Sequence, residues 1–104
     1  MIGPSTHIGM LISALSTPAD ADRFRQAHAV LQTHLLMTRD LPIGRDFLFP
    51  ADSTSVRAAI RELTEIEHTH GKDLHVDYTQ INDYFLLRII GDPAQRDEIE
   101  NYFK

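Results

Sequence analysis

The feature that most constrains the fold is a change of hydrophobic periodicity in the second half of the chain. After Asp52 or Ser53, either of which can cap a helix, apolar residues recur at three- and four-residue spacing. The members of this stripe are Val56, Ala59, Ile60, Leu63 and Ile66. Gly71 then offers a left-handed helix terminator, and from about residue 74 the apolar residues alternate as in a strand. The sequence therefore predicts a helix followed by strands.

The alternating segment, about residues 74–90, predicts an antiparallel β-hairpin with a two-residue turn at Asn82-Asp83. That turn selects one register, which contains two apolar pairs and one charge pair. The pairs are Val76 with Ile89, Tyr78 with Leu87, and Asp77 with Arg88. A slip by one residue would lose all three pairs, so they support the same register. A longer turn stays open, because Asn-Asp is a poorer turn pair than Asn-Gly.

Two further helices are predicted at the ends of the chain. Thr17-Pro18 is a typical helix opening, and the apolar stripe behind it carries the helix to about Arg39, where 41–44 ends it. That stripe is Ala21, Phe24, Ala27, Leu31 and Leu35. Asp92-Pro93 opens a last short helix, which docks through Ile99, Tyr102 and Phe103.

The remaining segments leave alternatives open. Residues 1–5 form a loose start, and residues 7–16 fit a helix better than a strand. The short apolar run 47–49 is either a strand or an anchoring loop. At 104 residues the chain is one domain, 1–104, without an internal sequence repeat. We expect a helix-rich α+β domain with an antiparallel hairpin and a C-terminal helix.

Composition narrows the function classes. The chain has no cysteine, which excludes disulfide frameworks, thiolate zinc sites and thiol catalysis. Its net charge of −5 disfavours nucleic-acid binding, which depends on a basic face. No signal peptide is recognisable, and no apolar run approaches the roughly 20 residues needed to cross a bilayer. We therefore expect a soluble cytoplasmic protein that has no contact with membranes.

The junction between helix and hairpin carries a possible metal site. His68, His70, His75 and Asp77 lie close together in the sequence, and imidazole with carboxylate suits zinc or another divalent metal. Residues two apart on a helix project about 200° apart, so His68 and His70 converge only if the helix has already ended. Histidines are also common in a last helical turn. We expect no cofactor, and keep a small metal-dependent or histidine-based enzyme as the alternative function.

Enzyme motifs are otherwise missing. The sequence contains neither a Gly-x-Ser-x-Gly elbow nor a dinucleotide glycine motif. Arg57 and Arg61 stand one turn apart on the best helix, with Arg88 expected nearby on the hairpin. They suit an acidic partner or, in a DNA-associated regulator, a phosphate backbone. The acidic balance ranks the DNA interpretation below the others.

The hairpin supports the function that we favour. It is apolar on both faces, so one face packs on the helices while the other needs a second cover. We predict a small cytoplasmic protein-interaction or regulatory module without its own catalytic centre, forming a homodimer or binding a protein partner. The predicted contacts are Tyr84, Leu86, Arg88 and Ile90, with Arg57 and Arg61. A third strand or a covering helix from the N-terminal segment is the alternative cover.

Overall fold

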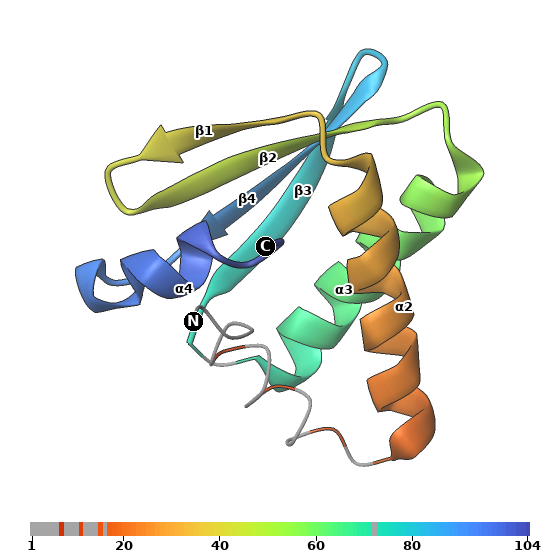
Figure 1. The fold of residues 1–104 in the computed structure, drawn as a ribbon, viewed down its shortest axis with the longest axis horizontal. Coiled ribbons are helices and arrows are strands. Elements are labelled where there is room, and N and C mark those ends of the chain that lie inside the picture. Colours follow the sequence, from red (N-terminus) through yellow and green to blue (C-terminus); the bar gives the residue numbers. More distant parts are fainter. Residues whose placement is uncertain (1–6, 8–10, 12–14, 16, 72) are drawn as a thin grey trace.

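The structure, a computed structural model, describes residues 7, 11, 15, 17–71 and 73–104. Its elements are α2 (Pro18–His34), β1 (Met37–Leu41), β2 (Gly44–Pro50), α3 (Thr54–His70), β3 (His75–Ile81), β4 (Tyr84–Ile90), the 3₁₀ turn η1 (Pro93–Gln95) and α4 (Arg96–Glu100). The strands form one antiparallel sheet in the order β1-β2-β4-β3, and both long helices lie on the same face of it (Figure 1). The predicted α+β class, with its hairpin and C-terminal helix, is confirmed.

The two expectations for the start of the chain, a loose 1–5 and a helix or strand over 7–16, lie outside the described residues except for three side chains. These are His7, Leu11 and Leu15. His7 and Leu11 are buried, and Leu15 packs at the edge of the core.

From α2 to β4 the chain forms two successive units, each a helix followed by a hairpin, and η1 with α4 follows them. The first is α2 with β1 and β2, and the second is α3 with β3 and β4. The inner strands β2 and β4 pair antiparallel and join the units into one sheet. Both helices have 17 residues, yet no repeat is visible in the sequence. The architecture repeats because each amphipathic helix needs a strand pair to cover its apolar stripe.

The core lies between the helices and the face of the sheet on which they pack, which we call the inner face. Strands β2, β3 and β4 contribute Phe47, Phe49, Val76, Phe85, Leu87 and Ile89 to it. Both predicted helix stripes are buried, apart from Leu35, which is half-buried beyond the end of α2. The C-terminal docking residues Ile99, Tyr102 and Phe103 are buried as predicted. Phe103 contacts the rings of Phe47 and Phe49 edge-on.

The first long helix is shorter than predicted. It ends at His34, and residues 37–41 form strand β1 instead of continuing the helix to Arg39. In the strand, Arg39 faces Asp46 and Asp40 faces Arg45, two opposite-charge pairs that a helix would not provide. Residues 42–43 are accordingly the turn of a hairpin rather than a helix stop. The run 47–49 is a strand, part of β2.

The predicted hairpin is confirmed in its turn and its register. β3 and β4 are joined by Asn82-Asp83, and Asn82 takes the left-handed conformation that asparagine tolerates. Asp77 does lie opposite Arg88, but each side chain binds elsewhere: Arg88 contacts Asp46 on β2, and Asp77 contacts His68. β4 has a neighbour on each side, β2 and β3, and Arg88 binds the buried carboxylate of Asp46 on β2.

Gly71 ends α3, but not in the predicted left-handed conformation, since its φ is −77°. A Cβ at this position would lie 2.2 Å from the side-chain Oε1 of Glu67 and 2.8 Å from its backbone oxygen. The glycine therefore makes room for the Glu67 carboxylate.

Candidate functional site

The face of the sheet turned away from the helices, the outer face, carries apolar side chains in two adjacent rows across the strands. The register defines them, because directly opposite residues share a face. The first row is Met37, Leu48, Leu86 and Thr79, and the second is Pro50, Tyr84 and Ile81. We call these the apolar rows. Their exposure is large for such side chains: 61% for Met37, 48% for Ile81 and 45% for Tyr84.

Within the described residues, no helix lies against the outer face. α2, α3 and α4 are all on the other side of the sheet (Figure 1). Alternation along β4 shows the consequence: Phe85, Leu87 and Ile89 are buried, while Tyr84 and Arg88 are exposed. Among the described residues, the outer face is therefore uncovered.

Next to the apolar rows runs a third row, the charged row, with one residue from each strand. In sheet order it is Arg39, Asp46, Arg88 and Asp77. Asp46 is only 2% exposed, although it lies on the open face, because two arginines close over it. Arg88 donates from Nε to Oδ1 at 2.8 Å and from Nη2 to Oδ2 at 3.0 Å, and Arg39 donates from Nη2 to Oδ2 at 2.6 Å.

These contacts also set the charge state of Asp46. The hydrogen bonds and charge of Arg88, joined by those of Arg39, outweigh burial and lower the pKa of the Asp46 carboxyl. The same ion pair raises the pKa of Arg88. Asp46 is thus held as a carboxylate between Arg88 and Arg39.

The structure brings four of the predicted binding residues together and separates the other two from them. Tyr84, Leu86, Arg88 and Ile90 share the outer face, as their spacing predicts. Arg57 and Arg61 are on α3, across the sheet, so the expected approach of Arg88 to them is wrong: its strand position turns it to the outer face. Arg57 donates to the backbone oxygen of Ala51 at 3.0 Å and lies over the Phe85 ring.

The predicted metal ligands meet only in part. His68 Nε2 lies 3.0 Å from Oδ1 of Asp77 and 2.6 Å from the backbone oxygen of Val76. His70, on α3, and His75, on β3, enter no such contact with them in the described structure. Across the described residues, no group of three or more His, Asp or Glu side chains is arranged to hold a metal ion. The zinc site stays a prediction that no described geometry supports.

A buried polar cluster, which the sequence did not predict, lies near the C-terminal end of α3. Glu67 is fully buried there, with its Oε1 and Oε2 at 3.0 and 2.9 Å from His7 Nε2, and the Tyr102 hydroxyl donates to Oε2. His28 Nε2 is 2.5 Å from the backbone oxygen of Tyr102. Glu67 falls four residues after Leu63 on the helix stripe, and that position was the signal for its burial.

The cluster shifts the pKa values of its members. Burial lowers the pKa of His7, but the hydrogen bond and charge of Glu67, with Asp73 beyond, outweigh it and leave this pKa raised. Burial, followed by the charge and hydrogen bond of Glu67, raises the pKa of Tyr102 well above its ordinary value. Burial lowers the pKa of His28. Its hydrogen bonds join His7, α3 and the C-terminal segment, and its residues line neither of two hollows found among the described residues, so we assign it to stability.

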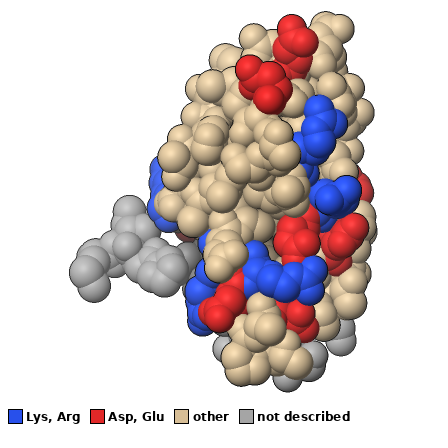
Figure 2. Space-filling model, turned by 90° about the vertical axis from the view of Figure 1, so that its right-hand side faces the viewer, with Lys and Arg blue, Asp and Glu red and all other residues tan. Residues whose placement is uncertain are grey.

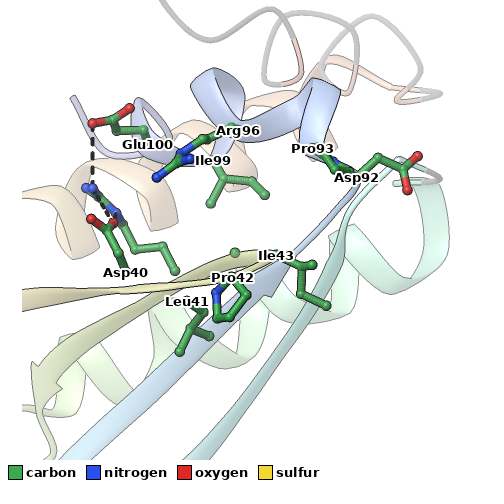
Figure 3. Close-up of a pocket in the computed structure, with 11 residues that line it drawn as sticks. Asp40, Leu41, Pro42, Ile43, Asp92, Pro93, Arg96, Ile99 and Glu100 are labelled. Atoms are coloured by element: carbon green, nitrogen blue, oxygen red, sulfur yellow. Dashed lines mark hydrogen bonds and ion pairs between the residues drawn. The ribbon is translucent and has the colours of Figure 1, made fainter.

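One of these hollows lies between the β1–β2 turn and the η1–α4 segment (Figure 3). Leu41, Pro42, Ile43 and Ile99 form its apolar lining. At its rim Arg45 binds Asp40 at 2.6 Å and lies 3.7 Å from Glu100. The volume, about 160 Å³, is below the 300–1,000 Å³ typical of ligand pockets. The other hollow is an open groove between α2 and α3.

The charges on the face shown in Figure 2 give no support to nucleic-acid binding. On the face shown in Figure 2, Lys and Arg side chains alternate with Asp and Glu and form no continuous basic patch.

Among the described residues no helix is long and apolar enough to cross a membrane. The chain matches no protein-family model, no curated protein and no solved structure.

Proposed function

We propose that this chain is a small cytoplasmic protein-interaction module, without a catalytic centre of its own, that forms a homodimer through the outer face of its sheet. The observation that carries the proposal is the pair of apolar rows on a sheet face that no described helix covers. A two-layer domain normally leaves its outer sheet face polar, with alternating side chains. Here the outer positions of β4 are mostly apolar.

Covering the apolar rows provides the driving force. Burial of apolar surface contributes about 25 cal/mol per Å², and a standard interface buries roughly 800 Å² on each partner. Met37, Tyr84 and Ile81 supply large side chains at the middle and edges of such an interface. Leu36, which is 53% exposed just before β1, extends the apolar surface beyond the sheet.

A second copy of the chain suits this face electrostatically. The whole chain carries a net charge of −5, so two copies repel each other through most of their surface. The charged row holds two arginines and two aspartates, and the apolar rows hold no charge. The outer face is therefore a neutral surface at which two acidic copies can meet.

The test is sedimentation velocity at concentrations from 1 to several hundred μM (about three decades). We expect the wild-type chain to form dimers, and Leu86→Asp to stay monomeric, because an aspartate at the centre of the apolar rows would be buried without a partner. Ala58→Asp adds the same charge on the exposed side of α3 and should leave the dimer intact.

Circular dichroism of each variant verifies that it is folded, since Leu86 is half-buried. A wild-type chain that remains monomeric over the whole concentration range would contradict the proposal. Equal weakening by Leu86→Asp and Ala58→Asp would show that added charge, rather than the outer face, governs association.

A further inference from the structure

We infer that the second copy lies face to face on the outer sheet face, related by a twofold axis that runs parallel to the strands between β2 and β4. Arg39 of each protomer then faces the partner's Asp77. This arrangement rests on the proposed homodimer and adds to it the orientation of the two copies and the residues that select it.

The order of signs in the charged row carries the inference. From β1 to β3 the row reads Arg39, Asp46, Arg88, Asp77, which is positive, negative, positive, negative. Read in the reverse direction, from β3 to β1, the same row is negative, positive, negative, positive. Two copies of the row that face each other in opposite strand order therefore place every charge opposite one of the other sign. A second copy turned over about an axis parallel to the strands faces the first in that order, because its β1 comes to lie over β3 and its β2 over β4.

At the two ends of the row, the groups that meet are accessible. Arg39 binds Asp46 and Asp77 contacts His68 within the chain, yet their side chains are 68% and 77% exposed and keep open surface that can reach across an interface. Two symmetry-related ion pairs result. In the middle of the row Asp46 is already closed over by its own arginines, and the partner meets a locked, neutral pair of Asp46 with Arg88.

The same axis places each apolar row over the same row of the partner, with the strand order reversed. Leu48 comes to lie over the partner's Leu86, and Pro50 over the partner's Tyr84. Sheets packed in this way lie about 10 Å apart, with their strands within about 30° of parallel. The apolar side chains of the two central strands thereby form the middle of the interface.

The other possible axes fit these residues less well. An axis that runs across the strands places each strand over the same strand of the partner. If the axis passes through the charged row, arginine meets arginine and aspartate meets aspartate. If it passes elsewhere, the charged row can fall on an apolar row. Like charges at close range and charges buried against apolar groups both oppose association. An axis perpendicular to the sheet joins the copies edge to edge and leaves the apolar rows uncovered.

Chemical cross-linking tests the orientation directly, because the chain has no cysteine and any introduced thiol is unique. Met37→Cys and Thr79→Cys place thiols at exposed ends of the first apolar row, on β1 and β3. In the inferred dimer the backbones at the two positions lie about 10 Å apart with their thiols pointing toward each other, whereas each thiol is displaced sideways by three strand spacings (about 14 Å) from its own copy. A bismaleimide with a reach of about 8 Å separates these cases.

The two variants, one of them ¹⁵N-labelled, are mixed, left to exchange subunits and cross-linked. We expect covalent dimers that join one Met37→Cys chain to one Thr79→Cys chain, and few in either variant alone. Cross-links within each variant but not between them, or none in a sample that sediments as a dimer, overturn the orientation while the homodimer stands. A monomeric wild-type chain overturns both.

Charge reversal gives an independent readout. Asp77→Lys should weaken the dimer about tenfold or more, because each lysine would face the partner's Arg39. Glu65→Lys makes the same change of net charge on the exposed side of α3 and should not weaken it. Adding Arg39→Glu to Asp77→Lys should restore affinity, with thermal unfolding recorded because Arg39 also binds Asp46. Equal effects of Asp77→Lys and Glu65→Lys would contradict the pairing.

Discussion

Asp46 is the residue that organises the outer face. It is buried, it has a lowered pKa, and it accepts three hydrogen bonds from two arginines. Asp46→Ala should reduce the free energy of unfolding by about 2–3 kcal/mol, since charge-assisted hydrogen bonds are lost. The loss stays below that of a fully buried ion pair because both arginines are partly exposed and regain water.

Chemical denaturation measures this loss. Asp22→Ala, which removes an exposed carboxylate paired with Arg25 on α2, serves as the control and should change stability by less than about 0.5 kcal/mol. The lowered pKa adds a pH dependence: the contribution of Asp46 is present above its unfolded pKa of about 4 and is lost as the pH falls through its folded value. Similar losses in the two variants would contradict the importance of Asp46.

His7 gives the fold a pH dependence on the alkaline side. Because its pKa is raised in the folded chain, its pairing with Glu67 stabilises fully below the ordinary histidine pKa of about 6.5 and is lost as the pH rises through the folded value. His28, whose pKa is lowered, acts in the opposite direction: its contribution is present above about 6.5 and falls as the solution is acidified.

A comparison with His7→Gln separates the two histidines, because His28 is common to both proteins. The difference in free energy of unfolding between the wild type and His7→Gln should be largest near pH 6 and should shrink toward pH 9 (roughly the range over which histidine releases its proton). Denaturant titrations at a series of pH values measure it. A difference that is constant with pH would show that His7 acts through packing alone.

At the scale of elements, the first hairpin depends on the close approach of β2 and β4. A Cβ on Gly44 would lie 2.1 Å from the backbone oxygen of Ile89, and a backbone atom cannot turn aside as the end of a side chain can. Gly44→Ala should therefore open the end of the sheet and lower the free energy of unfolding by about 1–3 kcal/mol. Hydrogen exchange should quicken at the amide of Gly91, which donates to the oxygen of Ile43 next to Gly44.

Gly91→Ala is the matched control for this clash. Its Cβ would meet only the ends of side chains, those of Gln95, Leu74 and Ile99, which can turn aside. We expect a smaller loss of stability there. A larger loss in Gly91→Ala than in Gly44→Ala would indicate that the docking of the C-terminal segment, rather than strand pairing, limits the stability of this end of the sheet.

At the scale of the whole molecule, dimerisation should couple stability to concentration. If the outer faces bury one another, the midpoint of thermal unfolding rises with protein concentration, because unfolding of a dimer releases two chains. Each tenfold increase contributes about 1.4 kcal/mol per dimer and should raise the midpoint by a few degrees. The midpoint of Leu86→Asp should be independent of concentration. Calorimetry measures both, and a constant wild-type midpoint would argue against a stable dimer.

The sequence by itself determined the elements that depend on neighbours along the chain. The stripe of α3, the turn at Asn82-Asp83 and the register of the hairpin follow from spacing and turn chemistry, and the structure confirms them. The shared face of the four predicted contacts on β4 follows from strand alternation in the same way.

Only the tertiary structure decided the features that depend on residues far apart in the chain. Residues 37–41 become a strand because β2 offers them charge partners, and Arg88 leaves Asp77 for Asp46, 42 residues away. Glu67 is buried because His7, 60 residues away, meets it there, together with Tyr102. An isolated sequence pattern carries no information on such partners, since a buried charge is stable only where a distant group neutralises it.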